Sequence, residues 1–170
     1  MQLKEAISLI QHELPEHATV WADLGCGDGL FTNALSQLLA DDSLIYAVDK
    51  SNNALKHVAV REEIKLEKLA LDFVKDAFPF KNLSGILMAN AFHFVKDKDA
   101  FIQKVFNCLN ENGYLLMVEY NTNVANMWVP YPISFKNLKS FFETYEWKTK
   151  KLNELPSRFG GSMYSAIISK

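Results

Sequence analysis

A short apolar run, Val20 to Leu24, leads directly into a loop with glycine at every second position. Asp23 lies near the end of this run. Three glycines follow before an apolar pattern at helical spacing begins: Gly25, Gly27 and Gly29. Glycine allows a sharp backbone turn, and it allows a ligand to approach where a Cβ would block it. A strand, a glycine-rich loop and a helix in this order predict a nucleotide-like ligand held in a doubly wound α/β fold.

The rest of the chain alternates apolar runs with apolar patterns at helical spacing. Such alternation predicts a parallel sheet whose right-handed crossovers are helices. Helices are expected over residues 3–14, 31–39, 53–59, 98–109 and 135–142. Strands are expected over residues 20–24, 44–48, 65–71, 86–89, 114–118, 147–155 and 162–169. The fold class is therefore α/β, Rossmann-like and doubly wound, with a mostly parallel seven-stranded sheet.

Polar residues and glycine mark where these helices begin and end. The candidate N-caps are Asn52 or Asn53, Asp97 or Asp99, and Ser134. The pair Asn112-Gly113 is expected to close the helix that begins near residue 98, as glycine does at helix C-termini. The last two strands alternate polar and apolar residues around a short Pro/Gly segment. This pattern predicts an antiparallel pair that adds one reversed strand at or near an edge of the sheet.

Composition restricts the class of protein. A chain of 170 residues fits one domain, residues 1–170, with a sizeable core. With 18 basic and 20 acidic residues, the net charge of −2 favours neither nucleic acid nor an anionic membrane surface. Two isolated cysteines, Cys26 and Cys108, indicate reduced thiols in a cytoplasmic protein, without metal-ligand spacing. No signal peptide or membrane span is expected.

Polar residues also end three later strands. Asp49 ends the second strand, the pair Asp72-Phe73 ends the third, and Asn90-Ala91-Phe92-His93 follows the fourth. In a parallel sheet these ends face the same crevice. Together with the glycine loop after Asp23, they make the chain similar to the class I S-adenosylmethionine-dependent methyltransferases of the small, minimal-core bacterial type. The resemblance extends from Val20 to the end of the chain, and in that family the seventh strand inserts antiparallel.

The resemblance implies S-adenosylmethionine as the cofactor, with its amino-acid part and sulfur against bare backbone of the loop. Asp23 would hold the ammonium group, directly or through water. Asp49 would accept both ribose hydroxyls, since a carboxylate offers two acceptor oxygens. Asp72 and the backbone of Phe73 would bind adenine. The full set implied for the cofactor is Asp23, Gly25, Cys26, Gly27, Asp49, Lys50, Asp72, Phe73, Asn90 and Ala91.

Each assignment has a structural alternative. Asp49 could cap a helix, Asp72 could be an ordinary loop acid, and Cys26 is interpreted as a small residue that fills a tight turn. His93 is the candidate catalytic residue, because it follows the fourth strand and could act as a general base near neutral pH. Its alternative is a histidine that packs under the loop. Methyl transfer is an in-line displacement that mainly needs alignment and exclusion of water, so a base helps without being obligatory.

The acceptor is expected to be a small molecule bound by the loop after the fifth strand. The candidates are Trp128 and Tyr131 in that loop, Arg158 between the last two strands, and Glu119 and Tyr120 at the strand end. Aromatic residues there could line a pocket for a planar acceptor. They could equally form a hydrophobic lid or a subunit contact, and Arg158 could be a turn residue. The short segment before the first strand suits an open pocket, or one completed by a second subunit in a homodimer.

Three other functions are compatible with parts of the sequence pattern. An NAD enzyme would have glycine or alanine at the sixth position of the loop, where Leu30 stands. An RNA or protein methyltransferase would use a basic surface such as Lys148, Lys150 and Lys151, which is more simply a solvated strand face. The third is a module that binds the cofactor without catalysis, against which the intact glycine loop argues. A methyltransferase with a small-molecule acceptor and no metal is the prediction.

Overall fold

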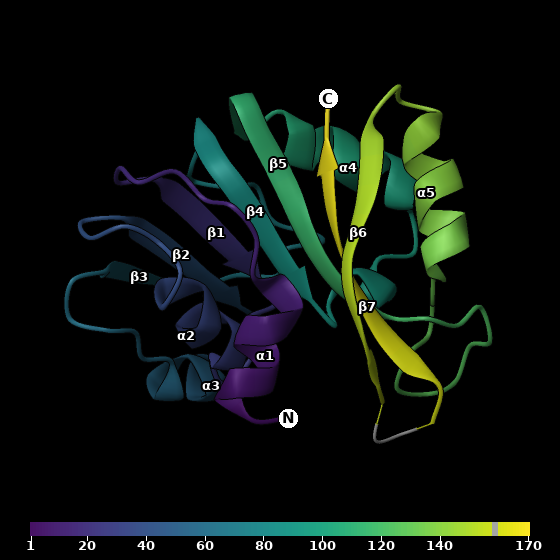
Figure 1. Ribbon diagram of the computed structural model, residues 1–170, viewed down its shortest axis with the longest axis horizontal. Coiled ribbons are helices and arrows are strands. Elements are labelled where there is room, and N and C mark those ends of the chain that lie inside the picture. The colour runs from purple at the N-terminus through teal and green to yellow at the C-terminus, as the bar shows by residue number, and fades with distance from the viewer. Residues whose placement is uncertain (158–159) are drawn as a thin grey trace.

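The computed structural model describes residues 1–157 and 160–170, and within them a seven-stranded mixed sheet forms the centre of the molecule (Figure 1). The strands are β1 (Val20–Leu24), β2 (Leu44–Asp49), β3 (Lys65–Ala70), β4 (Leu83–Ala89), β5 (Leu109–Tyr120), β6 (Lys148–Pro156) and β7 (Ser162–Ser169). Their order is β3-β2-β1-β4-β5-β7-β6. Neighbours from β3 to β5 are parallel. The winding reverses between β1 and β4, which is where such sheets open a crevice for ligands.

The carboxyl-terminal strands close the sheet in the predicted way. β7 runs antiparallel to β5 on one side and to β6 on the other. Ala166 of β7 pairs with Met117 of β5 and with Lys151 of β6. The reversed strand is thus second from the edge, which confirms the expected antiparallel pair and the doubly wound, mostly parallel class.

Helices cover both faces of the sheet. They are α1 (Leu3–Ile10), α2 (Leu30–Ser36), α3 (Asn52–His57), α4 (Lys98–Phe106) and α5 (Phe135–Glu143), with a 3-10 turn η1 (Phe92–Phe94). Neighbouring residues of a strand point to opposite faces. Trp21 therefore packs in the core that α1 and α2 cover, whereas Ala22 packs in the core that α4 and α5 cover. None of the described helices combines the length and apolar character needed to cross a membrane.

The end of α4 was predicted wrongly. The helix stops at Phe106 instead of Leu109, and β5 begins at once, so Asn112 and Gly113 lie within a strand. The pairing with β4 shifts register between Leu83 and Gly85. A Cβ on Gly113 would lie only 2.7 Å from the carbonyl oxygen of Leu83 in the neighbouring strand β4. Glycine is therefore needed here for close strand contact, and the sequence pattern resembles a helix C-cap only locally.

The helix N-caps were predicted with one error. The cap of α3 is Ser51, whose Oγ accepts the Ala54 N–H at 3.2 Å, and neither Asn52 nor Asn53 is the cap. Serine and asparagine are both favoured N-cap residues, so the run Ser-Asn-Asn did not show which of the three would be the cap. Asp97 and Ser134 are confirmed as the caps of α4 and α5.

The carboxyl ends of β1, β2, β4 and β5 meet at one edge of the sheet. The turn after β1 is held against β2, because the N–H groups of Gly25 and Cys26 both donate to the Val48 carbonyl oxygen, at 2.8 and 3.0 Å. The turn after β4 is held against β5 by a bond from the Asn90 N–H to the Val118 carbonyl oxygen at 2.8 Å. These bonds bring the predicted site residues to a common crevice.

Candidate functional site

The glycine loop exposes main chain because its backbone takes left-handed conformations. Gly25 has φ of +79° and Gly27 has φ of +52°. A Cβ on Gly25 would lie 2.8 Å from Cβ of Ala91 and 3.0 Å from the ring of Phe73. At Gly27 nothing lies within 4 Å of such a Cβ, so the loop borders open space there. Gly25 therefore lets the ends of β1 and β4 approach, and Gly27 leaves backbone accessible to a ligand.

Asp49 fixes the glycine loop from the end of β2. Its Oδ2 accepts the Gly27 N–H at 2.9 Å, and its Oδ1 accepts the Ser51 N–H at 2.8 Å. The helix-cap alternative for Asp49 is wrong, because the cap of α3 is Ser51 and Asp49 only accepts the N–H of that cap residue. A carboxylate has about four acceptor positions, so two bonds leave capacity on both oxygens. The half-buried group can hold the loop and still accept hydrogen bonds from a ligand.

Asp23 lies beneath the same loop and is almost fully buried, with 1% of its surface exposed. Thr32 of α2 donates its hydroxyl to Oδ2 at 2.7 Å. Oδ1 is buried and has no hydrogen-bond partner among the described residues. The pKa of Asp23 is raised to about 7, mainly by burial; the Thr32 hydrogen bond opposes this rise and the nearby Asp49 adds to it. A buried acceptor without a donor is a place where a cationic ligand group would be stabilised.

The turn after β3 carries Asp72 and Phe73. Asp72 Oδ1 accepts the Val74 N–H at 3.0 Å, and the Asp72 N–H donates to Asp76 Oδ2 at 2.8 Å. The carboxylate of Asp72 therefore shapes its own turn, which supports the loop-acid alternative without using all of its acceptor positions. Lys104 of α4 donates to the carbonyl oxygens of Phe73, at 2.8 Å, and of Asp76. This lysine was missed from the sequence, since nothing local marks a contact between residues 31 positions apart.

The segments that follow β1, β2, β3 and β4 line a cleft of about 390 Å³, called here the cofactor cleft. Seven of the ten residues implied for the cofactor line it: Gly25, Asp49, Lys50, Asp72, Phe73, Asn90 and Ala91. Asp23, Cys26 and Gly27 belong to the loop and strand behind. Burial raises the pKa of the Cys26 thiol, with Asp23 and Asp49 adding to the effect. This keeps the thiol neutral, in agreement with its interpretation as a small residue that fills the turn.

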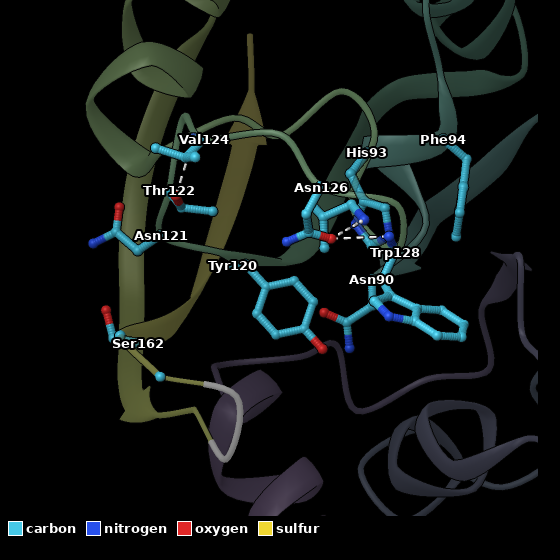
Figure 2. A pocket seen from close by; sticks show the side chains of 13 residues that line it. Asn90, His93, Phe94, Tyr120, Asn121, Thr122, Val124, Asn126, Trp128 and Ser162 are labelled. Atoms are coloured by element: carbon cyan, nitrogen blue, oxygen red, sulfur yellow. Dashed lines mark hydrogen bonds between the residues drawn. The ribbon is translucent and has the colours of Figure 1, made fainter.

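A second, larger cavity of about 740 Å³ adjoins the cleft, and it is called here the acceptor cavity (Figure 2). It is lined by Asn90, His93, Phe94, Tyr120, Asn121, Thr122, Val124, Asn126, Trp128, Val129, Gly160, Gly161 and Ser162. Asn90 and Phe94 line both spaces. A group held in one space can therefore meet a group held in the other beside these two side chains.

Asn90 is unusual at this junction. Its backbone has φ of +53°, which non-glycine residues adopt rarely and asparagine more readily than most. Its side-chain Oδ1 is buried and has no hydrogen-bond partner among the described residues. An unpaired buried carbonyl is costly unless a ligand supplies a donor.

His93 is paired with Glu119 from the end of β5. Glu119 Oε2 lies 2.8 Å from Nδ1 of His93, and Oε1 accepts the backbone N–H of the same histidine at 3.1 Å. Both residues are buried, with 2% and 1% of their surfaces exposed. Because a carboxylate only accepts, Nδ1 is the donor in this contact. Glu119 fixes one nitrogen of the buried ring, as the packed-histidine alternative implies, and the ring also lines the acceptor cavity. A role as a base stays a prediction.

The residues predicted for the acceptor have different surroundings. Trp128 lines the acceptor cavity and is 78% exposed at its mouth. Tyr131 is not among the described lining residues; Lys98 lies over its ring and donates to its carbonyl oxygen at 2.9 Å. Arg158 lies outside the described residues. Asn121 begins the loop that was expected to bind the acceptor, and it lines the cavity. Ser162 also lines it and was not singled out, because no pairing of β7 with β5 was predicted.

The chain resembles known methyltransferases in sequence and in fold. A family model described as "Methyltransferase domain" matches residues 22–117. A carboxy-S-adenosyl-L-methionine synthase of Helicobacter pylori is 32% identical over 103 residues, which are 57% of this chain and 41% of that protein. The chain spans less than half the length of the curated relatives it matches.

Solved structures agree on the fold. An S-adenosylmethionine-dependent methyltransferase from Leishmania major superposes with a TM-score of 0.71 at 19% identity, over 92% of this chain and 67% of that one. The magnesium protoporphyrin IX methyltransferase of Synechocystis with bound S-adenosylmethionine superposes with a TM-score of 0.69 at 13% identity, over 97% and 77%.

Proposed function

The chain belongs to the class I S-adenosylmethionine-dependent methyltransferases, and from this premise we propose that it methylates a small molecule bound in the acceptor cavity. One observation carries the proposal. The acceptor cavity and the cofactor cleft meet at Asn90 and Phe94, so an acceptor atom there can approach a methyl group held in the cleft. Displacement at carbon needs such an in-line approach.

The residues of the cleft suit the cofactor of this family. The unpartnered Oδ1 of Asp23 suits the ammonium group, and the remaining acceptor capacity of Asp49 suits the two ribose hydroxyls. The open space at Gly27 lets a ligand approach the main chain of the loop. In this proposal the turn at Asp72 and Phe73 holds adenine, and Asn90 and Ala91 border the amino-acid part.

When bound, S-adenosylmethionine supplies a methyl group on a positively charged sulfur, which is already a good leaving group. The chain's own residues align the acceptor, keep water out and handle the acceptor's proton. His93 can take that proton at Nε2, because Glu119 fixes the Nδ1 proton and stabilises the imidazolium that forms. In this proposal the His93–Glu119 pair, called here the dyad, is the general base of the acceptor cavity.

Binding of the cofactor is the first test. Calorimetry should show specific affinity for S-adenosylmethionine and for S-adenosylhomocysteine. Asp49→Ala should weaken both by 10-fold or more, since hydrogen bonds to a charged group are each worth about 1.5–3 kcal/mol. The control is Glu62→Ala, an exposed residue away from the cleft, which should bind like the parent protein. Unchanged affinity in Asp49→Ala would mean that ribose binds elsewhere.

Turnover is the second test. Transfer of a labelled methyl group should occur to compounds in a small-molecule pool and not to RNA or protein pools. Labelling of RNA alone, or binding of the cofactor without transfer to any pool, would overturn the proposed acceptor. Mass spectrometry of the cofactor after incubation checks a further outcome, a carboxylated cofactor, the product for which the Helicobacter pylori relatives are named.

A further inference from the structure

We propose that the acceptor is a neutral aromatic compound with a hydroxyl group, which the protein methylates on oxygen. This inference rests on the proposed function and adds the chemical class of the acceptor. It is carried by the walls of the acceptor cavity, by the hydrogen-bonding groups left free in it, and by the direction of proton transfer that the His93–Glu119 pair permits.

The walls of the cavity favour a flat ring. Phe94, Tyr120 and Trp128 come from three separate segments and line the same space. Figure 2 shows the ring of Tyr120 and the indole of Trp128 on the side of the cavity where the amide of Asn90 lies. Aromatic side chains bind aromatic ligands through apolar burial and ring–ring contacts, each worth about 0.5–1.5 kcal/mol beyond the buried area. A planar acceptor would gain from all three.

The charge of the lining favours a neutral ligand. Among the described lining residues no lysine, arginine, aspartate or glutamate is present. A carboxylate or an ammonium group brought into this space would lose hydration without gaining an opposite charge. Glu119 lies behind His93, and both of its oxygens already accept hydrogen bonds from that residue. The described part of the lining thus offers no charged partner to an acid or a protonated amine.

The amides of the lining are mostly used by the protein itself. Asn126 Oδ1 accepts the N–H groups of Trp128 and Val129, both at 2.9 Å. Asn121 donates to Glu154 at 2.9 Å and accepts the Phe135 N–H at 3.0 Å. These bonds shape the loop and leave Asn90 Oδ1 as the buried acceptor without a donor. A second donor on the ligand, apart from the hydroxyl whose proton His93 takes, would satisfy it.

The histidine explains why oxygen would be the methylated atom. An aromatic hydroxyl has a pKa near 10 and is mostly protonated at neutral pH. A base beside it increases the reactive anion in the transition state. As the new O–CH₃ bond forms, the hydroxyl proton moves to Nε2 of His93. The S–CH₃ bond breaks and its electron pair stays on sulfur, which becomes the neutral thioether of S-adenosylhomocysteine.

Three naphthalene probes that differ in one group test this class: 2-naphthol, 2-naphthylamine and 2-naphthoate. The first measurement is binding to the protein saturated with S-adenosylhomocysteine, and the second is transfer of a labelled methyl group. We expect 2-naphthol to bind at least 10-fold more tightly than 2-naphthoate and to give the methyl ether. Its absorption should shift toward that of the naphtholate on binding at pH 8, which reports proton transfer independently of turnover.

Variants of the dyad separate proton transfer from folding. Glu119→Gln should lower kcat for 2-naphthol by 100-fold or more, with little change in affinity for S-adenosylmethionine. Because the base is then lost, the remaining rate should follow ionisation of the naphthol itself and rise only at higher pH. His93→Gln should abolish the absorption shift of bound 2-naphthol. Glu111→Gln, on the exposed opposite end of β5, is the matched control and should behave like the parent protein.

Each contrary result points to a different part of the inference. Preference for 2-naphthoate or 2-naphthylamine overturns the inference, as does failure to methylate 2-naphthol while the cofactor binds and other compounds are methylated. An equal loss of cofactor affinity and activity in Glu119→Gln would make the dyad structural only. If the parent protein binds no S-adenosylmethionine and transfers no methyl group, the proposed function fails first, and this inference fails with it.

Discussion

Lys104 of α4 reaches across to the turn after β3 and donates its ammonium group to the carbonyl oxygen of Phe73 at 2.8 Å. The same group lies 3.9 Å from the ring centre of Phe78, over its face. Partial burial lowers the pKa of Lys104, while the nearby Asp76 opposes that change. One half-buried cation thereby holds the segment that borders the cofactor cleft on its Phe73 side.

Lys104→Met should therefore weaken the cofactor cleft without touching the acceptor cavity. Loss of a charged donor leaves the Phe73 carbonyl unpaired, which costs about 1–3 kcal/mol. We expect the Kd for S-adenosylmethionine to rise about 10-fold, with a lower Tm. Calorimetry measures the first and thermal unfolding the second. Lys81→Met, an exposed lysine near the same helix end, is the control. An unchanged Kd would mean that this turn does not contribute to cofactor binding.

Cofactor binding should release a proton from Asp23. Burial raises the pKa of this carboxyl to about 7, so the unliganded protein holds it about half protonated at pH 7. An ammonium group beside Oδ1 would lower that pKa, and about half a proton should leave. Calorimetry in buffers with different ionisation enthalpies measures the number. In Asp23→Asn the release should vanish, and equal enthalpies in all buffers for the parent protein would contradict the assignment.

Asp23 also predicts how the unliganded protein responds to pH. Because the folded state prefers the protonated carboxyl, its contribution to stability is full below pH 4 and is lost as pH rises through about 7. Saturation with S-adenosylmethionine should flatten this loss. The measurement is Tm against pH with and without the cofactor, and the Asp23→Asn variant should lack the dependence in both.

Two glycines of the same loop should respond differently to alanine. Gly25→Ala places a Cβ 2.8 Å from Cβ of Ala91, so the ends of β1 and β4 must separate. We expect loss of cofactor binding and a clear drop in Tm. At Gly27 the added Cβ meets nothing within 4 Å, so the cost is the left-handed backbone alone, about 1–2 kcal/mol. Equal effects of the two substitutions would show that space at Gly25 is not limiting.

Trp128→Ala should affect the acceptor and spare the fold. The side chain is 78% exposed, so its removal should change the free energy of unfolding by less than about 0.5 kcal/mol. Because the indole lines the acceptor cavity, kcat/KM for the acceptor should fall about 10-fold through KM. Steady-state kinetics and cofactor calorimetry distinguish this from a loss of S-adenosylmethionine binding. Val124→Ala, also exposed at the cavity, should have a smaller effect.

Local patterns were enough to predict those candidate site residues that lie at strand ends. Gly25 and Asp49 could be recognised because each directly follows or ends a strand, and parallel strands bring their ends together. Glu119 and His93 are 26 residues apart, and Lys104 and Phe73 are 31 apart. Such pairs depend on register and helix placement, which no short pattern encodes. Gly113 shows the opposite error. The pair Asn112-Gly113 resembles a helix C-terminus locally, but its close contact with β4 belongs to a strand.

The residues that line the cofactor cleft and most of those that line the acceptor cavity come from different parts of the chain. The segment that matches the family model ends at residue 117, inside β5, and the acceptor cavity takes only Asn90, His93 and Phe94 from before that point. All its other lining groups come from the last third of the chain. The residues that we propose for the cofactor therefore lie within the matched segment, and most of those proposed for the acceptor lie beyond it, so we expect homologues to differ more in the second group than in the first.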